Sequence, residues 1–147
     1  MEARNNNFCD IMDINIQLGR APSIASLINL RNSATAQTYS SFQGPLNQSI
    51  GYIAWASVNK ESLTQVRRHG TLPIYPYEWA EGRLILITEL LYQGSSRFAI
   101  RKLLSDLFIN RRVITFSRNK VVTTYCRHGK KFRLVDKIRI ESQQPAK

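Results

Sequence analysis

The 147-residue sequence has few cysteines and no long run of apolar residues. Its two cysteines, Cys9 and Cys126, are too few for a disulfide framework and lack the spacing of metal ligands. We therefore expect a protein of the reducing cytoplasm that holds no metal. No apolar run approaches the ~20 residues that span a bilayer. The polar, acidic start is unlike a secretory signal, so we expect neither a membrane segment nor a signal peptide.

The sequence also lacks the common catalytic motifs. GxSxG, HExxH, CxxC, Walker A and GxGxxG are all absent. Histidine is limited to His69 and His128, and no neighbouring residues complete a Ser-His-Asp set. His69 follows Arg67 and Arg68 and precedes Gly70, which is typical of the C-terminal end of a helix. We interpret it as a helix-end residue rather than a catalyst.

Acidic residues are scarce in the second part of the chain. Residues 1–96 carry seven Lys and Arg against seven Asp and Glu, whereas residues 97–139 carry thirteen against two. The whole excess charge of +11 therefore lies in residues 97–139, which favours an acidic partner: nucleic acid, an anionic membrane or an acidic carrier protein. A basic face kept for solubility is the alternative. Aromatic residues interleave with these charges and could stack on bases, although at strand spacing they are more often core residues: Phe98, Phe108, Phe116, Tyr125 and Phe132.

The spacing of apolar residues predicts helices and strands in a definite order. Helices are expected over 8–18, over 97–108, and from Ser23 to about Tyr39 with a face of Ile24, Leu27, Ile28 and Leu30; residues 60–70 are expected to form a short helix or a turn. Strands are expected over 51–59, 84–91, 112–117 and 121–127 and in the segment FRLVDKIRI. This order predicts one α/β domain over residues 1–141, with a single mixed sheet flanked by helices. Residues 142–147 are expected to form a disordered tail.

The central stretch runs from Trp79 to Phe108. Leu84–Leu91 predicts an apolar strand that Thr88 and Glu89 interrupt near its end. A Gly-Ser turn follows, and Ser95 or Ser96 can cap the helix that begins near Arg97. The strand, the turn and the helix N-terminus together form a place where backbone N–H groups can face an anion.

Four segments together resemble a known family. GYIAWAS, EWAEGRLILITELLYQG, a basic helix and TYCRHGKKF are similar to segments of the bacterial RTX toxin-activating lysine acyltransferases, the haemolysin activators. The resemblance covers roughly residues 19–131. The positions in register are Tyr52, Trp55, Ala56, Trp79, Gly82, Arg83, Gly94, His128 and Gly129.

The resemblance implies a fold like that of the GNAT acetyltransferases, and transfer of a fatty acyl group from acyl carrier protein to a lysine of a toxin or another protein. The donor's phosphopantetheine would be held by Leu91, Tyr92 and Gln93, and its phosphate by the turn of Gly94, Ser95, Ser96 and Arg97. Arg97, Arg101 and Lys102 would contact the acidic carrier. A homodimer remains open.

The sequence departs from the family at the catalytic residues. The position of the family histidine falls on Gly19-Arg20, and that of its aspartate on Thr88 or on Glu89. A lysine nucleophile must lose a proton, so we expect Glu89 to act as the base, aided by Thr88, with burial at a strand end raising its pKa. Alternatively, Glu89 forms a salt bridge with a nearby arginine. Because the family histidine is missing, the alternative function is that of a catalytically impaired relative that binds acyl carrier protein or nucleic acid.

Overall fold

The structure, a computed structural model, describes residues 2–43, 46, 49–70, 72, 76–93, 97–118 and 120–140. Its helices are α1 (Glu2–Gln17), α2 (Ile24–Ala36), α3 (Lys60–His69) and α4 (Arg97–Leu107), with a short 3₁₀ helix η1 (Pro76–Trp79). Its strands are β1 (Tyr39–Gln43), β2 (Ser49–Val58), β3 (Leu84–Tyr92), β4 (Val113–Arg118), β5 (Val121–His128) and β6 (Lys131–Arg139). The predicted helices and strands are therefore found in the predicted order, with one further strand, β1, and the short helix η1.

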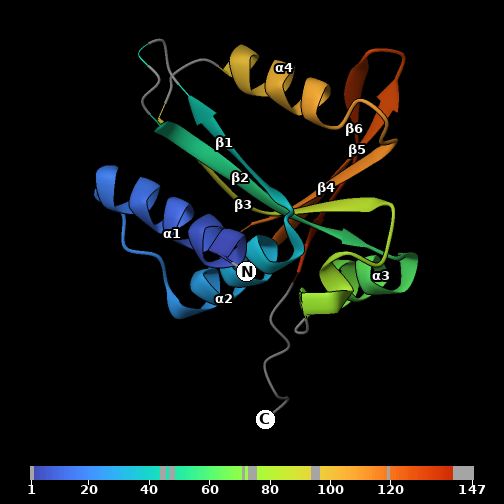
Figure 1. Cartoon of the computed structure of the whole chain (residues 1–147). Helices are drawn as coiled ribbons and strands as arrows, with labels where there is room; N and C mark the ends of the chain where they lie inside the picture. Colours follow the sequence, from blue (N-terminus) through green and yellow to red (C-terminus); the bar gives the residue numbers. More distant parts are fainter. Residues whose placement is uncertain are drawn as a thin grey trace.

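The described strands form one six-stranded sheet in chain order, β1 to β6. Neighbours are antiparallel except for β3 and β4, which α4 connects in the parallel sense. Helices cover both faces of the sheet (Figure 1). This is an α/β protein with a single mixed sheet, as the sequence predicts.

Three apolar clusters fix the helices on the sheet. One cluster, under α1 and α2, contains Ile11, Leu30 and Tyr52, and a second, under α3 and η1, contains Leu63 and Trp79. The third lies on the opposite face under α4 and contains these buried residues: Phe42, Ile53, Ile85, Ile87, Phe108 and Ile114. The sheet is therefore buried on both faces around β2 and β3, as the apolar run at Leu84–Leu91 indicates.

The second helix differs from its prediction in length and in face. It ends at Ala36, because Gln37 takes a left-handed conformation (φ 58°, ψ 36°) and Thr38 N–H bonds to Ser33 O at 2.9 Å. Tyr39 then begins β1, a strand that the sequence analysis missed. The predicted apolar face is wrong in part, because Ile24 and Ile28 are exposed.

Gly82 has a packing reason for being glycine. A Cβ at this position would lie 1.8 Å from the backbone oxygen of Val58, and the Gly82 N–H donates to Ser57 O at 3.1 Å. The segment before β3 therefore closes directly onto the end of β2, with buried Trp79 beside it. Any side chain here would force the two backbones apart.

Candidate active site

The two parallel strands at the centre of the sheet separate along their length. In the described part of the chain, β3 and β4 pair only at Ile85↔Ile114, Leu86↔Thr115 and Ile87↔Phe116. Beyond Ile87, β3 continues to Tyr92 while still paired with β2. Figure 1 shows β2 and β3 diverging from β4, β5 and β6, with α4 near the open end. The sheet therefore opens at the place where Thr88 and Glu89 lie.

A β-bulge at Thr88 determines which way the following residues face. Ala54 pairs with Glu89 and Trp55 with Ile87, so Thr88 is an extra residue on β3, and its hydroxyl donates to Ala54 O at 3.3 Å. Because of this extra residue, Glu89 does not share the α4 face with Ile87. It lies instead on the face of α1 and α2, where Leu91 also packs.

The bulge also turns backbone groups toward the opening. Gln93 N–H donates to Ile50 O of β2 at 2.7 Å. Since N–H and C=O groups alternate in direction along a strand, those of Leu90 and Tyr92 face the other side, where pairing with β4 has ended. An extended polar ligand could pair with this edge of β3.

Glu89 lies beside a buried tyrosine. Tyr52 is 2 % exposed, and its hydroxyl accepts from Asn15 Nδ2 at 3.0 Å. Buried Asn15 also donates to Ile11 O at 2.9 Å, which fixes its amide. Burial raises the pKa of Tyr52 most; the Glu89 charge raises it further, whereas the bond from Asn15 and the Arg20 charge lower it. Tyr52 therefore lies within the electrostatic reach of both Glu89 and Arg20.

Arg20 reaches this cluster from the turn after α1. Gly19 takes a left-handed conformation (φ 66°) and its N–H bonds to Ile16 O at 3.0 Å, while Arg20 N–H bonds to Asn15 O at 2.8 Å. Arg20 itself is exposed. The structure thus brings Arg20 to the same cluster as Glu89, although 69 positions separate them in the sequence.

The residues predicted to hold the donor lie on different faces of the sheet. Leu91 packs beneath α1, whereas Tyr92 packs on the α4 face against Phe42, with ring centroids 6.1 Å apart. Gln93 is exposed. The side chains of Leu91 and Tyr92 therefore do not form one pocket, and a donor would have to use the backbone edge described above.

The predicted phosphate turn lies largely beyond the described structure. Gly94, Ser95 and Ser96 are outside the described residues, and so is the predicted serine cap. Arg97 is the first residue of α4, and nothing is described of its side chain. Arg101 and Lys102 are exposed on α4.

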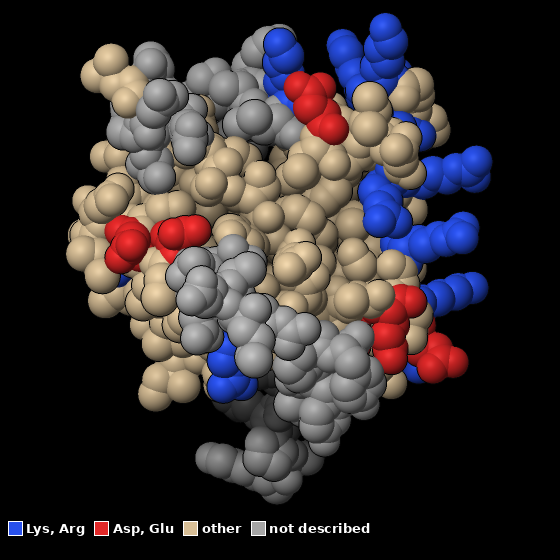
Figure 2. Space-filling view, viewed as in Figure 1, with Lys and Arg blue, Asp and Glu red and all other residues tan. Residues whose placement is uncertain are grey.

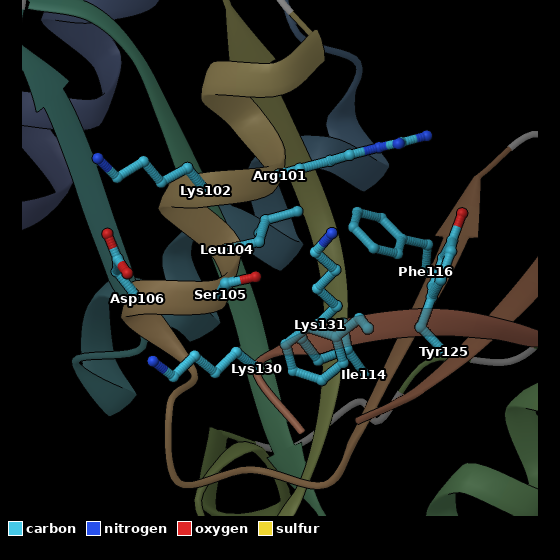
Figure 3. A pocket seen from close by; sticks show the side chains of 11 residues that line it. Arg101, Lys102, Leu104, Ser105, Asp106, Ile114, Phe116, Tyr125, Lys130 and Lys131 are labelled. Carbon is cyan, nitrogen blue, oxygen red and sulfur yellow. The ribbon is translucent and has the colours of Figure 1, made fainter. Parts of the chain in front are cut away.

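A groove of about 490 Å³ lies between α4 and strands β4, β5 and β6. We call it the α4–hairpin groove. It is lined by Arg101, Lys102, Leu104, Ser105, Asp106, Ile114, Phe116, Tyr125, Lys130, Lys131 and Phe132. Figure 3 shows Lys131 pointing toward α4, with Arg101 reaching toward the end where Phe116 and Tyr125 lie. Phe116 is also the last residue of β4 that pairs with β3, so the groove begins where the two strands separate.

Arg127 holds α4 beside this groove. Its guanidinium donates to Ser105 O (3.1 Å), Phe108 O (2.9 Å) and Arg111 O (3.1 Å), which are carbonyls at the C-terminal end of α4 and just beyond it. Its Cζ also lies 4.3 Å from the centroid of the Phe132 ring. One side chain therefore caps the helix and orients a ring of the groove floor.

Several of these residues received no role from the sequence. Tyr52 is one of the positions that match the resembled family, but the resemblance assigns it no function. Lys130 and Lys131 stood in TYCRHGKKF, whose basic composition was the available signal. Asn15 carried no signal, because a lone asparagine in a helix looks the same whether its amide is buried or solvated.

No protein-family model matches the chain, and a search of curated proteins gives no match either. None of the helices in the described ranges has the length and apolar character needed to cross a membrane. Among the residues whose placement is described, no three His, Cys, Asp or Glu side chains gather as metal ligands would.

Proposed function

We propose that this protein is an acyltransferase with a GNAT-like fold, which moves an acyl group from the phosphopantetheine of acyl carrier protein to a lysine side chain. The observation that carries the proposal is the opening between β3 and β4 with the Thr88 bulge and Glu89 beside it. Bulges often lie next to active sites, where they redirect a side chain. The resemblance over residues 19–131 supplies the donor and the acceptor.

The donor would bind along the open edge of β3. The amides of the pantetheine arm can pair with the backbone groups of Leu90 and Tyr92 that face the opening. The Gly94–Arg97 turn at the start of α4 would hold the phosphate, because a helix N-terminus favours an anion. Arg101 and Lys102, exposed on the same helix, would contact the acidic carrier.

Glu89 would act as the general base. The lysine amine attacks the thioester carbonyl, forming the C–N bond of the amide, while the C–S bond breaks and the thiol leaves. Glu89 accepts the proton that the amine loses, and the leaving sulfur takes up a proton in turn. Thr88, whose hydroxyl holds Ala54 O, keeps the bulge that directs Glu89. Arg20 cannot be the base, because a guanidinium stays protonated in proteins.

The test is acyl transfer measured by mass spectrometry. The purified protein is incubated with acyl-loaded carrier protein and lysine-bearing acceptor proteins, and acyl-lysine is counted. We expect Glu89→Gln to lower the transfer rate by about 10²–10⁴-fold, the usual contribution of a positioned base. Glu81→Gln, the same change at an exposed residue before β3, is the matched control. Unchanged transfer by Glu89→Gln would reject this mechanism.

A non-catalytic carrier-binding module is the second candidate, favoured by the absence of a histidine at Gly19-Arg20, where the resemblance places the family histidine. Binding of acyl carrier protein by the wild-type protein, with no acyl-lysine formed on any acceptor, would support this function over catalysis.

A further inference from the structure

The α4–hairpin groove combines an apolar floor with a cationic rim. The floor consists of aliphatic and aromatic side chains that reach it from both the helix and the strands: Leu104, Ile114, Phe116, Tyr125 and Phe132. Ile114 is 2 % exposed, so the floor joins the apolar core under α4. Its volume of about 490 Å³ lies in the ordinary range of small-molecule sites. The groove can therefore bury an apolar body of moderate size.

The rim places positive charge on both sides of this floor. Arg101 and Lys102 come from α4, and Lys130 and Lys131 from the β5–β6 turn and the start of β6; all four are exposed. Among the described residues that line the groove, Asp106 alone is acidic. Figure 2 shows Lys and Arg projecting along the edge of the molecule where β5 and β6 lie in Figure 1. A ligand here would need an acidic group near its apolar part.

The rings of the floor are already engaged with protein groups. Phe116 and Tyr125 meet edge to face, with centroids 5.8 Å apart, and the Arg127 guanidinium covers one face of Phe132. Bases stack best on open ring faces, whereas an alkyl chain packs equally well on ring edges and on Leu104 or Ile114. The lining therefore favours an aliphatic chain over a nucleobase.

We propose that the α4–hairpin groove binds an anionic amphiphile, a molecule with one alkyl chain and an acidic head group. The chain lies on the floor, and the head group meets Lys131 and Arg101. The thioester of the proposed donor carries no charge beside its acyl chain, so this ligand is a free acid and not the carrier-bound donor. The binding of such an amphiphile does not rest on the proposed function.

The test is calorimetric binding of saturated fatty acids below their micelle concentrations. Octanoate, decanoate and dodecanoate are compared with acetate, with dodecyl phosphate as a second head group and dodecanol as the neutral analogue. We expect affinity to rise about fourfold for each added methylene, the value for burying one CH₂ group. We expect both acidic probes, dodecanoate and dodecyl phosphate, to bind more tightly than dodecanol, because the rim recognises negative charge. A higher affinity for one of the two acidic probes shows which head group, carboxylate or phosphate, the rim fits better.

A matched pair of variants tests the rim. Lys131→Glu should weaken dodecanoate binding at least about tenfold, because it replaces a charge-assisted contact by repulsion. Lys137→Glu makes the same change at an exposed position of the same strand outside the groove, and should alter affinity less than about twofold. Leu104→Gln tests the floor, and should weaken dodecanoate more than octanoate.

Equal effects of the Lys131 and Lys137 variants, or affinities independent of chain length, would overturn the proposal. Tight binding of a single-stranded oligonucleotide, with alkanoates bound no better than acetate, would assign the groove to nucleic acid instead. Acyl transfer is measured separately. Alkanoate binding without transfer contradicts only the proposed function, and transfer without alkanoate binding contradicts only the groove assignment.

Discussion

Tyr52 links the two charged residues of the candidate active site at the level of single side chains. Its buried hydroxyl is hydrogen-bonded to Asn15, and its pKa is raised by the charge of Glu89 and lowered by that of Arg20. Such a fixed, buried hydroxyl holds α1 against the strand pair that carries Glu89. We therefore regard Tyr52 as a positioning residue rather than a catalytic one, since at 2 % exposure it cannot contact a substrate.

Tyr52→Phe removes the partner of a buried amide. We expect the free energy of unfolding to fall by about 1–2 kcal/mol, because Asn15 keeps its desolvation cost without this hydrogen bond. Urea unfolding at neutral pH measures the change. Tyr125→Phe, at a half-buried tyrosine in the groove, is the control and should cost less. A Tyr52→Phe protein as stable as wild type would contradict the role given to this bond.

The same variant has a pH signature. The pKa of Tyr52 is raised above its ordinary value of 10.0 in the folded protein, so the fold favours the neutral phenol. This contribution is fully present below pH 10 and is lost as the pH rises through the folded-state pKa. We expect wild type to lose stability more steeply than Tyr52→Phe as the pH rises above 10.0, the ordinary pKa of tyrosine. Parallel stability curves for the two proteins would show that Tyr52 titrates alike in both states.

At the scale of secondary-structure elements, Arg127 attaches the C-terminal end of α4 to strand β5. Its three hydrogen bonds to carbonyls at and beyond the end of α4 need the planar fork of a guanidinium. We expect Arg127→Lys to lower the free energy of unfolding by about 2 kcal/mol and to weaken dodecanoate binding, because α4 forms one wall of the groove. Denaturant unfolding and calorimetry measure both effects. Arg133→Lys, on exposed β6, should change neither.

At the scale of the whole molecule, the excess positive charge gathers on α4 and at the β6 edge of the sheet. The exposed cations of residues 97–139 lie on α4, on β6 and in the turns of the last three strands, whereas residues 1–96 are neutral as a set. Such a field attracts an acidic partner before any contact forms. It also favours orientations in which α4 and the hairpin of β5 and β6 face that partner.

Carrier binding should therefore depend strongly on salt. We expect the affinity for acyl carrier protein to fall about tenfold or more between 50 and 300 mM salt, measured by fluorescence anisotropy. Arg101→Glu with Lys102→Glu should weaken binding, whereas Lys60→Glu with Arg68→Glu on α3, across the sheet, should have a small effect. Equal effects of the two double variants would mean that net charge alone, and not its location, attracts the carrier.

The sequence by itself determined what depends on near neighbours. The nearly continuous apolar run Leu84–Leu91 indicated the central strand, the apolar spacing of residues 97–108 indicated α4, and the charge count separated a neutral from a basic part. These features follow from local propensity and composition. The prediction of α2 failed at its end because the left-handed turn at Gln37 has no strong sequence signal.

Only the tertiary structure decided the arrangement of the candidate sites. The Thr88 bulge exists because β3 is one residue longer than its partner between two paired positions, and this register turns Glu89 toward Tyr52 and Arg20. The groove exists because Arg127 fixes α4 beside the strands. Both depend on contacts between residues far apart in the chain, and such contacts leave no local pattern in the sequence.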